Sequence, residues 1–124
     1  MVDLEIKANM LVTLRFHIPY VDDDEYYYLQ GLKRIGAIEK PFYLLCMFGD
    51  GRTLTPAGER EQALWFKANR ATMRERCKAI AIVRDKVTPK SVEVFRKLFE
   101  VPLIGARDER EAKHFLETIA GHTL

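Results

Sequence analysis

Residues 41–49 read PFYLLCMFG. This apolar run has the length of a β-strand and carries no charge, which is typical of a strand buried on both faces of a sheet. A second such run, AIAIVRD, spans 79–85, and a shorter one, VPLIGA, spans 101–106. Apolar strands separated by helix-length segments predict a mainly parallel sheet with helices packed against it.

The segments between the apolar runs begin with helix signals. Thr55-Pro56 and Thr88-Pro89 each offer an N-cap residue followed by a proline that suits the first helical position. The first pair predicts a long helix from Thr55 to about Lys78. The second predicts a helix whose apolar stripe consists of Val92, Phe95, Leu98 and Phe99.

Two further helices begin with an aspartate followed three residues later by a glutamate, which is the capping-box spacing. Asp22 and Glu25 precede a helix that runs through DDEYYYLQGLKRIG and ends at Gly36. Asp108 and Glu111 precede the last helix, which ends at Gly121.

The N-terminal segment LEIKANMLVTLRFHI alternates between apolar and polar residues, which predicts a β-hairpin. Its strands are expected at Leu4–Lys7 and Met10–Ile18, with Ala8-Asn9 as the turn. The predicted order is β-β-α-β-α-β-α-β-α, with about four helices and an antiparallel hairpin at the edge of the sheet. We expect residues 1–124 to form a single α/β domain.

Three stretches resemble the SpoIIAA-like branch of the STAS superfamily, the anti-sigma-factor-antagonist fold. They are DDEYYYLQGL at 23–32, CKAIAIVRD at 77–85 and VPLIGARDEREAKHFL at 101–116. The resemblance covers nearly the whole chain and implies a non-enzymatic regulatory role. In this family a phosphorylated serine at the start of the helix after the third strand switches binding to a partner kinase. The matching segment here, DGRTLTPAGE, has no serine, so Thr53 and Thr55 are the candidate phosphoacceptors.

Composition limits the function classes. The net charge of +2 is too small to indicate a nucleic-acid partner, and no apolar run is long enough to span a bilayer. The early acidic residues argue against a signal peptide, so we expect a cytoplasmic location. Cys46 and Cys77 are far apart in the sequence and are expected to be reduced and buried.

The residues that catalysis needs are not arranged for it. Ser91 is the only serine and lies in a predicted helix start, and His17, His114 and His122 are not spaced as metal ligands. The Gly-Asp-Gly at 49–51 matches no nucleotide-binding loop. We therefore predict no enzyme activity, no metal and no cofactor.

Ligands of open α/β sheets bind beyond the carboxyl ends of the strands. Two junctions there, GDGRTLTP and RDKVTP, each combine an aspartate, a cation, a threonine and a proline, a setting in which a helix N-terminus can hold an anion. The alternative is that both are simply capped helix starts. The candidate binding residues are Asp50, Arg52, Thr53, Thr55, Arg84 and Lys86.

The long helix has basic residues on one side and more than one apolar stripe, although covering a sheet needs only one. The extra stripe could meet another subunit or a partner, and the basic side could meet anionic lipid or an acidic protein. The candidate interaction face consists of Trp65, Phe66, Lys67, Arg70, Met73 and Arg74.

Three functions remain open at this level. The first is a non-enzymatic regulatory or binding module that contacts a partner protein or a second copy of itself. The second is binding of a small apolar or lipid-like ligand with peripheral membrane association, because the SpoIIAA-like fold is similar to that of lipid-carrying CRAL-TRIO domains. The third is an enzyme of unrecognised type, for which the sequence offers no catalytic set.

Overall fold

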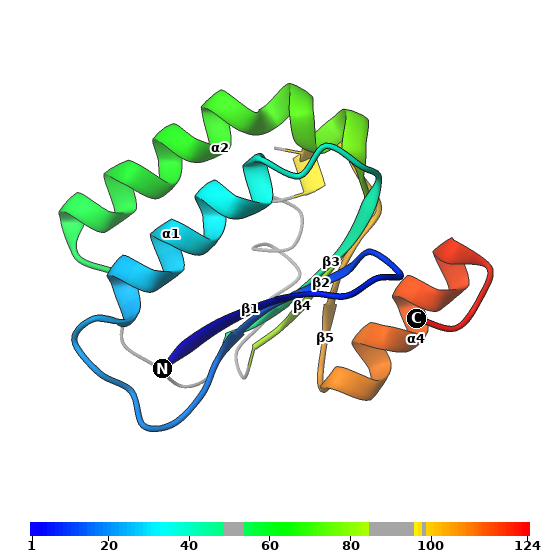
Figure 1. The fold of residues 1–124 in the computed structure, drawn as a ribbon, viewed down its shortest axis with the longest axis horizontal. Helices are drawn as coiled ribbons and strands as arrows, with labels where there is room; N and C mark the ends of the chain where they lie inside the picture. Colours follow the sequence, from blue (N-terminus) through cyan, green and yellow to red (C-terminus); the bar gives the residue numbers. More distant parts are fainter. Residues whose placement is uncertain (49–53, 85–95, 98) are drawn as a thin grey trace.

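The computed structural model describes residues 1–48, 54–84, 96–97 and 99–124 (Figure 1). Its five strands form one sheet. They are β1 (Val2–Ile6), β2 (Leu11–Phe16), β3 (Phe42–Met47), β4 (Cys77–Val83) and β5 (Leu103–Ala106). The helices with defined bounds are α1 (Asp24–Gly36), α2 (Pro56–Arg76) and α4 (Glu109–Ala120).

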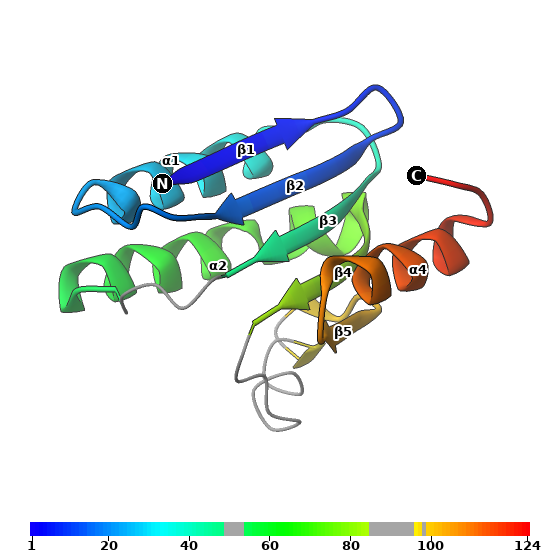
Figure 2. The ribbon, with the colours of Figure 1, turned by 90° about the horizontal axis from the view of Figure 1, so that it is seen from below.

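The strands follow one another across the sheet in the order β1-β2-β3-β4-β5 (Figure 2). The β1 strand pairs with β2 antiparallel, whereas the pairs β2–β3, β3–β4 and β4–β5 are parallel. The predicted α/β class, the mainly parallel sheet and the N-terminal hairpin are confirmed. The helix predicted after Thr88 falls largely on residues 85–95 and 98, which lie outside the described ones.

Helices cover both faces of the sheet. The α1 and α2 helices lie side by side on one face, and α4 lies on the other (Figures 1 and 2). Side chains of β2 alternate accordingly: Val12 and Leu14 belong to the core under α1 and α2, and Leu11 belongs to the core under α4. In the described part of the chain no helix combines the length and the apolarity needed to cross a membrane.

Several predicted boundaries shift for identifiable reasons. The second strand begins at Leu11 because Met10, with a φ of 66°, belongs to the turn. The long helix ends at Arg76, before the predicted Lys78, because Cys77 is buried and pairs with Phe42 of β3.

The capping box predicted for Asp22 and Glu25 is wrong. The N-cap of α1 is Asp23, whose side chain makes no capping hydrogen bond. The carboxylate of Asp24 instead accepts the Val21 N–H at 3.0 Å, and the carboxylate of Glu25 points to the start of α2. Contacts with other segments therefore override the local capping-box pattern.

The N-cap of α4 is confirmed at Asp108, whose carboxylate accepts the Glu111 N–H at 2.8 Å. We expect Asp108→Ala to lower the free energy of unfolding by about 1 kcal/mol, because it removes this bond. Asp23→Ala is the matched control and should cost at most a few tenths of a kcal/mol, since only the charge near the helix dipole is lost. Urea unfolding of the two variants would measure this difference. Equal losses would contradict the assigned caps.

Candidate functional site

The carboxyl edge of the parallel strands is also the edge at which α1 and α2 begin (Figure 1). Thr55, the N-cap of α2, accepts the Gly58 N–H at 3.1 Å. Its own N–H and hydroxyl donate to the Glu25 carboxylate at 2.6 and 2.9 Å. Glu25 belongs to the first turn of α1. We call this arrangement the Glu25–Thr55 latch, because it ties the starts of the two helices together.

The latch requires glycine at position 58. A Cβ atom there would overlap Oε1 of Glu25, so no larger residue fits without moving the carboxylate. The Thr55 hydroxyl already donates one bond and accepts another, and a phosphate on it would meet the negative charge of Glu25. Phosphorylation of Thr55 therefore remains a prediction. In this conformation the negative charge of Glu25 would oppose it.

An aromatic cluster lies at the same edge. The ring centroids of Phe16, Tyr28 and Phe48 are 5.4 to 6.0 Å apart. The guanidinium carbon of Arg84 lies 5.8 Å from the Phe48 centroid, a cation–π contact. Arg84 therefore contacts the cluster, while Asp50, Arg52, Thr53 and Lys86 lie outside the described residues.

Three buried groups have raised pKa values. The hydroxyl of Tyr28 donates to Oε1 of Gln62 at 2.5 Å, and burial raises its pKa above the ordinary value. Burial also raises the pKa of Cys46 and of Cys77 from 9.0 to about 12. Both thiols are free and buried, as the sequence predicted. At neutral pH all three groups keep their protons.

These shifts predict a loss of stability in alkali. Above pH 9 the unfolded chain releases thiol protons that the native state retains, so the native state becomes relatively less favourable as the pH rises. The urea midpoint should therefore fall between pH 8 and pH 10. A Cys46→Ala/Cys77→Ala variant should show a smaller fall over the same range. Parallel pH profiles for the two proteins would contradict the expectation.

The residues predicted as one face of α2 point in different directions. Met73 is 1% exposed and belongs to the core, so its assignment to an interaction face is wrong. Trp65 faces α1, where its Nε1 would be 3.1 Å from a Cβ on Gly36, and Phe66 stacks edge-on against Phe99.

Only some of the basic residues on the predicted interaction face of α2 are available to bind a partner. Arg70 and Arg74 both approach Oε1 of Glu100, at 3.4 and 3.0 Å, whereas Lys67 is exposed. The α2 helix is basic along this side, but Glu100, which is distant in the sequence, neutralises part of the positive charge.

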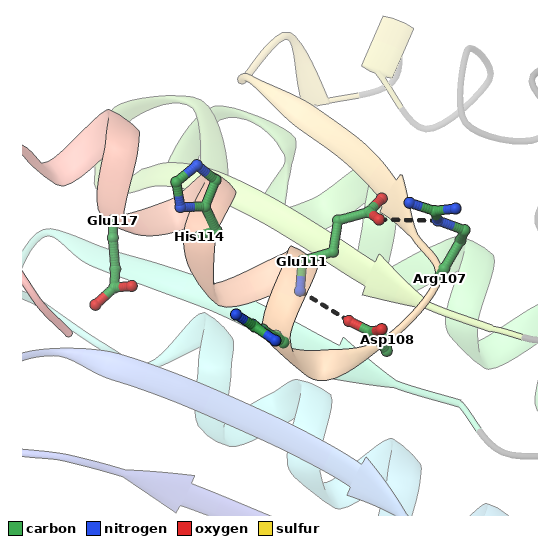
Figure 3. Close-up of a pocket in the computed structure, with 6 residues that line it drawn as sticks. Arg107, Asp108, Glu111, His114 and Glu117 are labelled. Atoms are coloured by element: carbon green, nitrogen blue, oxygen red, sulfur yellow. Dashed lines mark hydrogen bonds and ion pairs between the residues drawn. The ribbon is translucent and has the colours of Figure 1, made fainter.

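A shallow depression runs along the outer side of α4 (Figure 3). Its lining residues are Arg107, Asp108, Arg110, Glu111, His114 and Glu117. Arg107 pairs with Glu111 at 3.0 Å, and Glu117 accepts the N–H of Leu124. Charges of both signs alternate here and the Arg107–Glu111 pair is already joined, which does not favour a charged ligand. Across the described ranges no cluster of His, Cys, Asp and Glu is arranged to hold a metal ion.

Large apolar side chains are exposed in a short segment at the carboxyl edge. Ile18 is 75% exposed, Val21 41%, Tyr26 60% and Tyr27 54%. The rings of Tyr26 and Tyr27 contact each other edge-on with centroids 5.3 Å apart. We call these four residues the tyrosine patch.

A search of solved structures found a close match in fold. An uncharacterised protein of the DUF3478 family from Shewanella loihica PV-4, described as having a SpoIIAA-like fold, superimposes with a TM-score of 0.63. The match covers 94% of this chain and 92% of the other, at 14% sequence identity. This chain has a SpoIIAA-like fold. No protein-family model and no curated protein matches the sequence.

Several polar groups at the carboxyl edge are hydrogen-bonded to other groups of the same chain. The Thr55 hydroxyl is bound by Glu25 and Gly58, and the Tyr28 hydroxyl by Gln62. The tyrosine patch, by contrast, faces solvent, and the sequence analysis did not select it. A signal was present, because Tyr26 and Tyr27 lie outside the apolar stripe of the first helix, which consists of Tyr28, Leu29, Leu32 and Ile35.

Proposed function

We propose that this SpoIIAA-like domain is a non-enzymatic binding module of the cytoplasm, which acts through protein–protein contacts made by the tyrosine patch. The supporting observation is the concentration of four large exposed apolar side chains within residues 18–27. Exposed large apolar side chains gathered in one segment are typical of interaction sites, and tyrosine is enriched among the residues that dominate binding energy.

The tyrosine patch rests on a well-anchored support. Val21 donates its N–H to the Asp24 carboxylate at 3.0 Å, and the amine of Met1 lies 3.0 Å from the same carboxylate. The Glu25–Thr55 latch fixes the first turn of α1, which carries Tyr26 and Tyr27. A surface that is already ordered loses less conformational entropy on binding.

Site-specific photo-crosslinking in cells tests the proposal. A benzophenone side chain at position 27 should form a defined heavier adduct, and the same side chain at exposed Lys33 of α1 is the control. The adduct is identified by mass spectrometry and the interaction is reproduced with two purified proteins. Tyr26→Ser/Tyr27→Ser should weaken that interaction by about tenfold or more, as expected for central aromatic contacts.

The other outcomes count against the proposal. Adducts that are equal at positions 27 and 33, or a purified interaction that survives the double substitution, would rule out the tyrosine patch as the contact surface. An adduct with a second copy of the chain would make the module a homodimer. Co-sedimentation with vesicles that depends on Tyr26 and Tyr27 would favour the lipid alternative instead.

A further inference from the structure

The charge around the tyrosine patch restricts its partner. Residues 18–27, IPYVDDDEYY, hold four acidic residues and no lysine or arginine. Asp22 and Asp23 are exposed, and the Asp23 carboxylate is not used for capping α1. The segment that carries the tyrosine patch is therefore acidic.

We infer that the tyrosine patch recognises a basic, arginine-bearing segment of a partner protein. This inference rests on the proposed function and names the chemistry of its partner. Opposite charges speed association and exclude wrong partners, so an acidic segment with exposed apolar side chains fits a basic segment of a partner. Nucleic acid and anionic membranes carry the same sign of charge as this segment and would be repelled.

The aromatic pair favours arginine over lysine. Tyr26 and Tyr27 meet at an interplanar angle of 79°, so the pair offers both a ring face and a ring edge to solvent. A guanidinium group stacks on an aromatic face and can bond a carboxylate through its planar fork, whereas an ammonium group cannot do both. The domain already contains one such contact, between Arg84 and Phe48 at the same edge.

Fluorescence anisotropy with a defined probe tests the inference. The probe is a labelled peptide with four arginines separated by glycines, and its lysine and glutamate counterparts are the comparison. We expect the arginine peptide to bind about threefold tighter than the lysine peptide, as one exposed cation–π contact allows. Asp23→Lys should weaken binding of the arginine peptide by about fivefold at low salt. Glu39→Lys, an equal charge reversal near the far end of α1, is the matched control.

The Tyr26→Leu/Tyr27→Leu variant separates the apolar contribution to binding from the aromatic one. It keeps the patch apolar and should abolish the preference for arginine over lysine. Equal effects of Asp23→Lys and Glu39→Lys, or no preference for arginine in the native chain, would overturn the inference. If the crosslinked partner then binds through an apolar segment, the proposed function stands while this inference fails. If position 27 yields no adduct above the control, the proposed function itself fails.

Discussion

Replacing Leu14 with alanine is expected to lower the free energy of unfolding by about 2–5 kcal/mol, the range for leucine-to-alanine changes in well-packed cores. Leu14 is 1% exposed on the central part of β2 and packs in the core beneath α1 and α2. Its Cδ1 atom would lie 3.1 Å from a Cβ on Gly31, so the helix rests directly on this side chain. The substitution leaves a cavity that the surrounding helix and strands can fill only in part.

Leu64→Ala is the matched control, because it makes the same chemical change on the outer side of α2. Leu64 is 66% exposed, and alanine is a better helix former than leucine. Its free energy of unfolding should stay within about 0.5 kcal/mol of the native value. Urea unfolding of the two variants provides the comparison. A large loss at Leu64 would show that the outer side of α2 is covered in solution, for example by a second copy.

Gly58→Ala is expected to destabilise the domain by about 1–2 kcal/mol, because it displaces the Glu25 carboxylate and loses two charge-assisted hydrogen bonds. The new Cβ would overlap Oε1 of Glu25, so the carboxylate has to move. This change in stability has the opposite sign to the usual one, since glycine-to-alanine changes inside helices ordinarily stabilise a protein by about 0.5–1 kcal/mol.

A double-mutant cycle isolates the cause. In a Glu25→Ala background the obstructing carboxylate is gone, and Gly58→Ala should become stabilising. Thermal or urea unfolding of the four proteins gives the coupling free energy. If Gly58→Ala has the same effect in both backgrounds, the Glu25–Thr55 latch does not exist as described.

Structural features that depend only on residues close together in the sequence could be predicted from the sequence. The apolar run that contains β3 reflects burial on both faces of the sheet, and the alternation in β1 reflects burial on one face. Thr55 and Asp108 were found as N-caps because the capping bond joins residues only three apart. Gly121 was found as a helix end because its φ of 78° suits glycine.

Contacts between distant segments were not predictable in the same way. Asp22 and Glu25 match a capping box as well as Asp108 and Glu111 do, yet Glu25 bonds Thr55, thirty residues away. Met73 fits an exposed stripe of α2 by its spacing, but the angle at which α2 lies on the sheet buries it. The partners of a helical side chain depend on how the helix is placed, and helical periodicity alone does not give that placement.

The sequence by itself determined the α/β class, the order of the described elements and the N-caps Thr55 and Asp108, because hydrophobic period and capping chemistry act over a few residues. The tertiary structure decided which side chains remain exposed. It buried Met73, engaged Thr55 and Arg84 in internal contacts, and left Tyr26 and Tyr27 in solvent. Exposure depends on what packs against each residue, and in this domain the covering element comes from elsewhere in the chain.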